Sequence, residues 1–290
     1  MTLEQLRIFV GVAEREHMTK AAAALNVTQS TASAAVASLE GQFGVQLFHR
    51  IGRRIELTDA GHAFLEEARA VLGRASGAEH VLSDFSRLKR GTLRLVVSQT
   101  IAGYWLPRHL AAFRAMHGQI ILDVAIANTE HAAQSVLAGT AELGFAEGAI
   151  SDPALEHWPV AQDQLMLVGL AAPAQTDEQW VRAARWVMRE RGSGTRSTFE
   201  ETLRSRGIDP ETLNIALTLP SNESVLTAVE AGAGVAVLSA LVVDRAIRTG
   251  TLRHIPFELP ARPFFGLHHK ERYQSKAARA MLKCIKEGTS

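Results

Sequence analysis

The chain contains little cysteine, few aromatic residues and almost no net charge. One cysteine among 290 residues, Cys284, excludes both an internal disulfide and a cysteine-based zinc cluster. The net charge of +1 excludes general polyanion binding, so any affinity for nucleic acid must come from a local basic patch. No segment reaches the roughly 18–20 apolar residues of a membrane span, and residues 1–9 lack the layout of a secretion signal. We therefore expect a cytoplasmic protein without membrane contact.

The signatures of enzyme and metal sites are also missing. The adjacent His268 and His269 would point to opposite faces of a strand, which does not suit chelation of one metal. The sequence contains neither a Gly-x-Ser-x-Gly elbow nor a Walker A loop. Glu147 and Glu190 lie at predicted strand ends without a nucleophile, so we interpret them as ligand-lining or hinge groups. We expect no enzyme, and neither a catalytic residue, a metal site nor a cofactor.

Residues 19–48 have the pattern of two short helices joined by a tight turn. Thr19 is predicted to cap the first helix, Asn26 and Val27 make the turn, and Thr28 caps the second helix. The inward-facing positions are Ala21, Ala22, Leu25, Ala32, Val36 and Leu39. The other face of the second helix carries small hydrogen-bonding side chains near its N-terminus: Gln29, Ser30 and Ser33. A recognition helix presents such side chains to base edges in the major groove.

A basic hairpin follows these two helices. Gly44 is predicted to end the second helix, after which Leu47 and Phe48 return to the core. Residues 49–54, His-Arg-Ile-Gly-Arg-Arg, form a basic turn before a short alternating strand at 55–57. A helix-turn-helix followed by a basic hairpin is a winged helix, whose arginines meet phosphates or enter the minor groove. The alternative is a plain helical hairpin followed by a solvated run of charge.

The next element is predicted to be a helix of about thirty residues. Thr58 is its expected N-cap, and Asp59 suits the positive end of the helix dipole. Its apolar positions recur at threes and fours: Phe64, Leu65, Ala68, Val71, Leu72, Ala75, Ala78, Val81, Leu82 and Phe85. A small winged-helix domain cannot cover so long a stripe. We favour pairing with the same helix of a second chain, which would address a pseudo-palindromic site. Packing on the chain's own C-terminal domain is the alternative.

From residue 93 the pattern alternates between strands and helices, which favours parallel sheets covered by helices. Strands are predicted at 93–98, 120–127, 142–148, 165–170, 185–190, 214–219, 234–239, 252–257 and 263–269. Helices are predicted at 103–116, 129–138, 195–206 and about 222–231, and from Ser275 onward. This order predicts two α/β lobes, between which the chain crosses near 161–164 and 258–264.

Ligands of open α/β sheets bind beyond the carboxyl ends of the strands, where helix N-termini favour anions. Four polar segments take such places: 98–100, 128–130 with Thr129 as the expected cap, 192–196 and 221–224. In Gly-Ser-Gly-Thr-Arg at 192–196, Ser193 and Thr195 can donate hydrogen bonds, and Arg196 can pair with an anion. A plain turn is the alternative there. A ligand held between the lobes would close them and shift the geometry of a dimer.

The run from Leu3 to Gly61 resembles the N-terminal domain of LysR-type transcriptional regulators. The match is carried by LRIFVGVAE, AAAALNVTQSTASAAVASLE, GVQLFHR and GRRIELTDAG. The later two-lobed pattern is similar to the family's periplasmic-binding-protein-like sensor. The resemblance implies a DNA-binding regulator whose dimers commonly pair into tetramers. RERGSGTR and LPSNESVLTAVEAGAGVAVLS are similar to a branch that includes sulfite- and sulfur-assimilation regulators. Where the family often has an Arg after the recognition-helix Ser, this chain has Ala34 and Ala35.

We therefore expect an α+β multidomain protein with a winged helix-turn-helix at 1–58, a linker dimerisation helix at 59–90 and an effector-binding domain at 91–290. Lobe I is expected at about 91–162 and 264–290, and lobe II at about 163–263. The expected DNA contacts are Thr28, Gln29, Ser30, Thr31, Ser33, Arg50, Arg53 and Arg54. The expected effector contacts are Ser98, Thr100, Asn128, Thr129, Glu147, Ser193, Thr195, Arg196, Asn222 and Glu223.

Three alternatives stay open for the effector. In the first, the effector is a small inorganic oxyanion such as sulfite or sulfate. In the second, it is an organic carboxylate or phosphorylated metabolite, which needs extra apolar room. In the third, the protein is an effector-independent DNA-binding scaffold whose cleft is vestigial. The expected partners are promoter DNA, a small anionic effector and a second copy of the chain in a homodimer or homotetramer. RNA polymerase is a further partner expected of such a regulator.

Overall fold

The computed structural model describes residues 1–51, 54–85, 91–148 and 150–288. Contacts divide the chain into two compact units, one built mainly from Met1–Phe85 and the other from the residues that follow. Each unit has its own hydrophobic cores. Within the described ranges, no helix is long and apolar enough to cross a membrane.

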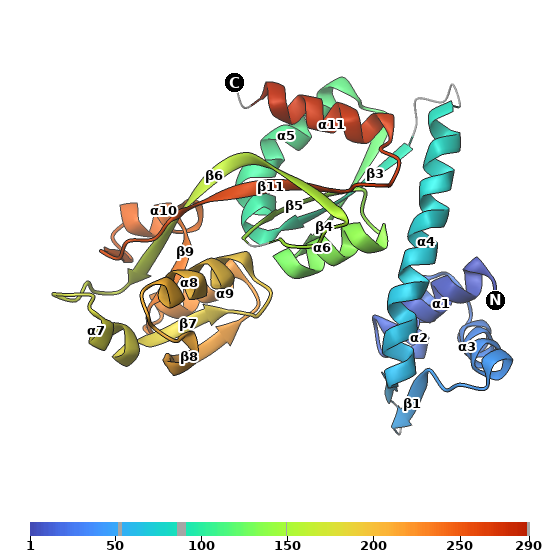
Figure 1. Ribbon diagram of the computed structural model, residues 1–290, viewed down its shortest axis with the longest axis horizontal. Helices are drawn as coiled ribbons and strands as arrows, with labels where there is room; N and C mark the ends of the chain where they lie inside the picture. The colour runs from blue at the N-terminus through green and yellow to red at the C-terminus, as the bar shows by residue number, and fades with distance from the viewer. Residues whose placement is uncertain (52–53, 86–90, 149, 289–290) are drawn as a thin grey trace. The chain divides into compact units, whose positions relative to one another are not determined.

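The first unit contains a helix-turn-helix, a two-stranded wing and a long helix (Figure 1). Its elements are α1 Leu3–Ala13, α2 Met18–Ala24, α3 Gln29–Phe43, β1 Phe48–Ile51, β2 Arg54–Leu57 and α4 Asp59–Phe85. The prediction that Thr19 caps the first helix is wrong, because the cap lies two residues earlier, at His17, whose Nδ1 accepts from the Lys20 amide at 3.4 Å. Thr28 caps α3 as predicted, and Gly44 ends it in the left-handed conformation with φ +66°.

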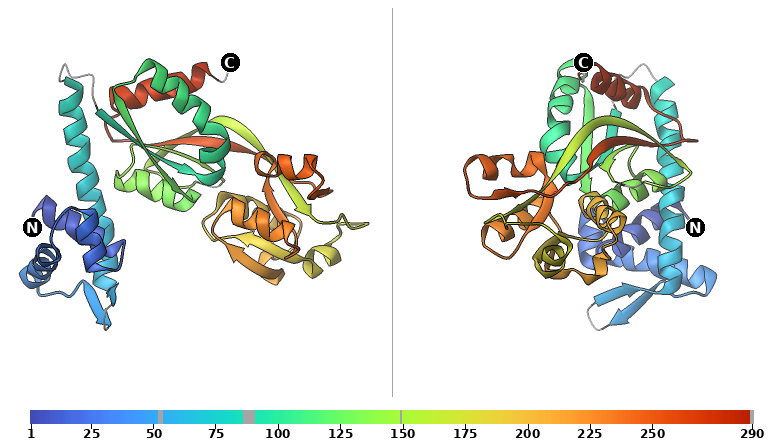
Figure 2. Two further views of the ribbon diagram at one scale, coloured as in Figure 1. Left: turned by 180° about the vertical axis from the view of Figure 1, so that it is seen from behind. Right: turned by 60° about the vertical axis from the view of Figure 1, so that its left-hand side comes forward.

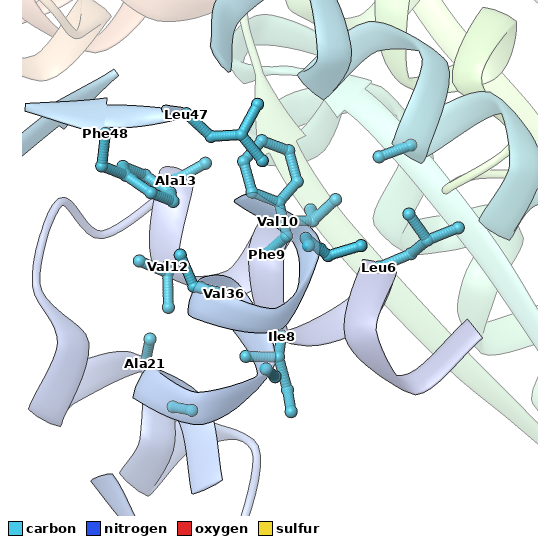
Figure 3. Close-up of a cluster of buried hydrophobic side chains, with 14 of the residues drawn as sticks. Leu6, Ile8, Phe9, Val10, Val12, Ala13, Ala21, Val36, Leu47 and Phe48 are labelled. Atoms are coloured by element: carbon cyan, nitrogen blue, oxygen red, sulfur yellow. The ribbon is translucent and has the colours of Figure 1, made fainter. Parts of the chain in front are cut away.

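Aromatic and aliphatic side chains from every helix of this unit share one core (Figure 3). The Phe9 ring is central, with its centroid 5.5 Å from that of Phe48 in β1 and 4.9 Å from that of Phe64 in α4. Leu65 and Ala68 of α4 are buried in the same core, so the first half of the long apolar stripe is covered within its own unit. Further along α4, Leu82 is 73% exposed.

Lobe I of the second unit is a sheet with helices on both faces (Figure 1). Its parallel strands lie in the order β5 Leu143–Glu147, β3 Gly91–Ser98 and β4 Ile120–Ala127. Its helices are η1 Ile101–Trp105, α5 Leu106–Met116, α6 Thr129–Ala138 and α11 Lys276–Glu287. Apolar residues of β3 pack against α5 and α11, whereas α6 covers the other face. The predicted helix at 103–116 instead starts as a π-helical turn at Ile101.

Two long strands join lobe I to lobe II. β6 Leu155–Gly169 and β11 Ala261–His269 pair antiparallel from Ala261↔Gln164 to His269↔Leu155, with an irregularity between Phe264 and Phe265. Both strands extend as one twisted ribbon (Figures 1 and 2). β6 then continues into lobe II, where it pairs with β9 and β10. The sequence predicted a strand only from 165, because Pro159 and the polar residues before it break the apolar alternation.

Lobe II packs helices on both sides of its strands. Its strands are β7 Arg185–Arg189, β8 Asn214–Leu219, β9 Ala236–Ser239 and β10 Arg253–Ile255. Its helices are α7 Glu178–Ala183, α8 Gly194–Ser205, η2 Pro210–Thr212, α9 Asn222–Glu230 and α10 Ala240–Arg248. Phe199 of α8 packs with Trp186 and Met188 in one cluster, and Val225 of α9 packs with Val187 and Leu238 in another. Successive side chains of β7 therefore alternate between two faces, one packed against α8 and the other against α9.

Candidate DNA-binding surface and the junction between the lobes

The exposed N-terminal turn of α3 carries the polar side chains predicted to read DNA. The Thr28 hydroxyl caps the helix, accepting from the Thr31 amide at 3.1 Å, and lies 2.8 Å from the hydroxyls of both Ser30 and Thr31. Gln29 is exposed and has no hydrogen bond to the rest of the described chain, whereas Ser33 is half-buried. Thr28 therefore serves first as a structural cap, and Gln29 is the side chain with the greatest freedom to meet a base.

The two alanines that replace the family's arginine lie on different sides of α3. Ala34 is exposed, whereas Ala35 is 9% exposed and packs in the core. Only position 34 therefore belongs to the outer face, and a long side chain at position 35 would need space inside the core.

A carboxylate of α3 positions the start of the wing. Glu40 Oε1 accepts from the amides of Leu47 at 2.8 Å and Phe48 at 3.2 Å. Two backbone donors are thereby satisfied where the chain enters β1, so the wing is fixed to the end of the second helix of the motif. The sequence analysis missed this residue, because a glutamate inside an exposed helix has no distinctive spacing.

The backbone of Arg50 lies in β1 opposite Ile55, and that of Arg54 lies in β2 opposite Ile51. The tip of the wing, including Arg53, is outside the described residues. The antiparallel register confirms the predicted hairpin, whereas phosphate contacts by the three arginines stay a prediction.

Most of the residues predicted to bind an effector converge where the two lobes meet. Those buried there are Ser98, Thr100, Thr129, Glu147, Ser193, Thr195, Arg196 and Asn222. Asn128 is half-buried, and Glu223 is exposed. The residues come from the ends of β3 and β5 and from the beginnings of α6, α8 and α9, as the rule for ligand sites in α/β sheets requires.

Thr129 does not cap α6 as predicted. Asn128 Oδ1 accepts from the His131 amide at 3.0 Å and so performs the capping. The Thr129 hydroxyl instead donates to the Glu147 carbonyl at 2.6 Å. A Cβ at Gly194 would clash with this same carbonyl and with the Thr129 hydroxyl, so glycine permits α8 of lobe II to approach β5 of lobe I closely.

A buried ion-pair cluster sits on the two joining strands. Arg262 of β11 is 3% exposed and donates to Asp163 Oδ2 of β6 through Nε at 2.9 Å and Nη2 at 2.8 Å. Its Nη1 donates to the Thr195 hydroxyl of lobe II at 3.2 Å, and Nη2 lies 3.7 Å from Glu147 Oε1 of lobe I. One guanidinium therefore contacts both strands and both lobes.

Hydroxyl donors complete this ion-pair cluster. The Ser239 hydroxyl donates to Asp163 Oδ1 at 2.6 Å, and the Ser98 hydroxyl donates to Glu147. Sequence analysis identified Ser98 and Glu147 but missed Arg262 and Asp163. Asp163 lies between Gln162 and Gln164, and Arg262 lies between Ala261 and Pro263, so neither charged residue has a local pattern that marks it.

Arg196 is already engaged within lobe II. Its Nε lies 2.6 Å from Glu200 Oε1, its Nη1 donates to the Arg189 carbonyl at 3.1 Å, and it is 8% exposed. Arg196 would therefore have to leave the Glu200 carboxylate before it could pair with an anion, and that pairing stays a prediction.

The N-terminus of α8 differs from that of α9. Ser193 is 3% exposed at the N-cap position of α8, yet its hydroxyl makes no hydrogen bond to the described chain, and the first turn contains no acidic residue. In α9, Ser221 caps the Ser224 amide at 3.0 Å in a reciprocal capping box. α8 therefore keeps an unused hydroxyl beside the positive end of its dipole.

Glu223 influences a tyrosine of the other lobe. The pKa of the Tyr104 phenol is raised, first by partial burial and then by the negative charge of Glu223. Glu223 therefore adds negative potential toward lobe I, which is unfavourable for an anion at this side of the junction.

Both parts of the chain match models of known protein families. Residues 3–62 match the model of bacterial regulatory helix-turn-helix proteins of the lysR family, and residues 86–290 match the LysR substrate binding domain. The chain belongs to the LysR family of transcriptional regulators. These proteins regulate transcription and are not enzymes, which agrees with the expectation from sequence.

This LysR-family chain is similar to curated relatives along nearly its full length. It is 33% identical to the HTH-type transcriptional regulator YeiE of Escherichia coli (strain K12), covering 97% of this chain and 96% of the relative. It is 30% identical to a probable RuBisCO transcriptional regulator of Cyanidioschyzon merolae, covering 96% and 95%. Neither name refers to sulfur assimilation, so neither supports the narrower resemblance to that branch.

Solved structures confirm the LysR-type architecture. CbnR, a LysR family transcriptional regulator, superposes with a TM-score of 0.68 at 26% identity and covers 100% of both chains. Full-length CbnR complexed with its target DNA gives a TM-score of 0.65 at 27% identity, covering 99% of each chain.

Proposed function

We propose that this LysR-type regulator binds an interrupted palindrome in promoter DNA through the exposed turn of α3 and the wing. Gln29, Ser30, Thr31 and Ser33 would face the bases, while Arg50, Arg53 and Arg54 would supply phosphate or minor-groove contacts. The exposed, unbonded Gln29 and the likeness to the DNA complex of CbnR support this assignment. Because its target is promoter DNA, we place its action in the cytoplasm, with RNA polymerase as a further partner.

We propose that α4 dimerises the chain and that 1–58, 59–90 and 91–290 act as DNA-binding, linker and effector-binding parts. The exposed Val71, Ala78 and Leu82 on α4 support a partner helix, because these apolar side chains are not covered by the described part of the chain. Two copies would present two recognition helices to two half-sites. Pairing of dimers into tetramers follows from the family resemblance.

We propose that the effector is a small anion seated at the N-terminus of α8. One observation carries this assignment: Ser193 is a buried residue whose hydroxyl makes no hydrogen bond to the described chain and lies beside backbone amides that no side chain caps. Thr195, Thr129 and Thr100 add hydroxyls at the same junction, where Ser98 and Glu147 are also buried. Since Arg196 is held by Glu200, neutral donors rather than a free arginine would bind the anion.

Two classes of anion fit this seat. Sulfite and sulfate are small enough for one helix N-terminus, and an organic carboxylate or phosphorylated metabolite would use the same donors. The regulatory domain of Synechocystis PCC6803 CcmR was solved in complex with 2-PG, and its likeness, at 23% identity with a TM-score of 0.62 over 69% of this chain, is one of fold alone. 2-PG therefore serves as one probe among several.

Thermal unfolding of the full chain tests the effector site. We expect one of sulfite, sulfate, thiosulfate, phosphate, 2-PG and small carboxylates to stabilise the chain by about 2.7 kcal/mol at 100 times its Kd. Ser193→Ala should abolish this stabilisation. Ser205→Ala is the control, because its hydroxyl donates to the Thr202 carbonyl at 2.8 Å, at the far end of the same helix.

Equal stabilisation of wild type and Ser193→Ala would place the anion elsewhere. No stabilisation by any anion would favour the effector-independent scaffold.

A further inference from the structure

The side chain of Gln99 reaches from lobe I to the start of α9 in lobe II. Its Oε1 accepts from the Asn222 backbone amide at 2.9 Å, and its Nε2 donates to the Pro220 carbonyl at 2.9 Å. The amide of Gln99 thus offers one acceptor and one donor to a complementary pair on the other lobe. Such a two-point match fixes the orientation of the amide group.

The neighbouring Thr100 contacts the same residue of α9. Asn222 Nδ2 donates to the Thr100 hydroxyl at 3.0 Å, and Asn222 Oδ1 accepts from Arg189. Arg189 is held in turn by Glu190, through Nε at 2.8 Å and Nη2 at 2.9 Å. The buried arginine therefore directs the amide nitrogen of Asn222 toward lobe I, so Arg189 acts as a positioning residue for this contact.

These contacts occupy the N-terminus of α9. The Ser224 amide bonds to Ser221, and the Asn222 amide, which has no acceptor within its own helix, bonds to Gln99. α8 lacks a side-chain cap, as described above. Of these two helices at the junction, α9 is capped by a side chain of the opposite lobe, whereas α8 is not.

We propose that Gln99 is a tethered ligand that caps α9 across the junction, holds the lobes together and competes with an effector for this helix. Sulfate offers acceptors only, so it could replace Gln99 at the Asn222 amide but would leave the Pro220 carbonyl without its donor. The contact thereby directs anions to α8. The competition rests on the proposed effector function, whereas the capping of α9 by Gln99 does not.

Hydrogen exchange of the full chain tests the cap without any effector. In Gln99→Ala, the Asn222 backbone amide should exchange roughly tenfold faster than in wild type, because Gln99 Oε1 is its only acceptor among the described residues. Gln164→Ala is a matched control, since the Gln164 amide donates to the Leu165 and Leu259 carbonyls at 3.0 Å within the strands and loops of lobe II. Asn222 exchange should be unchanged in this control.

A sulfate titration tests the competition. The sulfate concentration at the midpoint of stabilisation in thermal unfolding should fall several-fold in Gln99→Ala relative to wild type and Gln164→Ala. The reason is that sulfate no longer has to displace Gln99 from the Asn222 amide. Unchanged Asn222 exchange in Gln99→Ala would overturn the cap, and accelerated exchange with an unchanged or higher sulfate midpoint would overturn the competition. If sulfate stabilises neither protein, the proposed effector site fails for this anion, while the exchange result still decides the cap.

Discussion

Removing the guanidinium of Arg262 should destabilise the effector-binding domain more than any surface charge substitution. Arg262→Met replaces the aliphatic part of the side chain but leaves Asp163, which is 4% exposed, with the Ser239 hydroxyl as its remaining partner among the bonds described above. Glu147, 3% exposed, loses its nearest cation as well. Both buried carboxylates would then lack the charge that compensates them.

The expected cost follows from the burial of this pair. Breaking a buried ion pair by removing one partner costs about 3–5 kcal/mol. Each kcal/mol lowers Tm by roughly 2–4 °C in a domain of about 200 residues, so Tm should fall by roughly 6–20 °C. The exposed pair Arg248–Asp244, with N–O separation 2.8 Å and side chains 73% and 59% exposed, is the control. Arg248→Met should cost at most about 1 kcal/mol.

Calorimetric unfolding of the full chain measures both variants. The double variant Arg262→Met, Asp163→Asn should recover part of the loss, because a neutral amide tolerates burial better than an unpaired carboxylate. A cost below about 1 kcal/mol for Arg262→Met would refute the reasoning. Equal destabilisation of the single and double variants would show that lost packing, rather than uncompensated charge, determines the cost.

Four further predictions concern pH, DNA binding and assembly. Burial, followed by the Arg108 charge, lowers the pKa of His109 below its ordinary 6.5. Because the unfolded chain then binds the proton more tightly than the folded chain, domain stability should decline as pH falls below about 6.5. His109→Phe should reduce that decline in thermal scans from pH 8 to 5. Gln29→Ala should cost about 1–3 kcal/mol at particular base positions in binding assays with operator variants, and a uniform loss at all positions would indicate a backbone contact instead. Arg53→Ala should weaken binding to all sequences and reduce the salt slope by about one, and an unchanged slope would argue against a phosphate contact. Leu82→Glu should shift the light-scattering mass of the full chain toward the monomer, and an unaltered mass would contradict pairing through this part of α4.

The winged helix could be predicted closely from sequence because its signals are local. Thr28 and Gly44 mark the ends of α3, and the spacing of Ala32, Val36 and Leu39 identifies the buried face. The first cap was misplaced because His17 is an uncommon capping residue, whereas Thr19 is a favoured residue type.

The joining strands were harder to predict because their structure depends on distant pairing. The first half of β6 contains Pro159 and exposed polar residues, and it becomes a strand through pairing with β11, about a hundred residues later. The sequence analysis also missed α7 and α10. α10 begins directly at the end of β9, with Ser239 as its cap, so no loop residues separate the two elements.

At the junction of the lobes, the types and positions of the polar residues in the sequence predicted where the candidate effector site lies. Hydrogen bonds and ion pairs within the chain give some of these residues other roles than the predicted ones. Ser193 and Thr100 lie where strand ends and helix starts meet, as predicted. Arg196 was expected to face an anion, yet a glutamate one helical turn later holds it. Gln99 and Arg262 gained their roles only from partners in other elements, which no local pattern indicates.

The most direct test of the central claim is binding of the full chain to randomised double-stranded DNA, selected and sequenced with and without the anion that stabilises the protein. The account predicts an interrupted palindrome with two half-sites, and an affinity or half-site spacing that changes when the anion is added to wild type but not to Ser193→Ala. Selection of no sequence, or identical selection and affinity under all conditions, would contradict an effector-responsive regulator that reads DNA through α3.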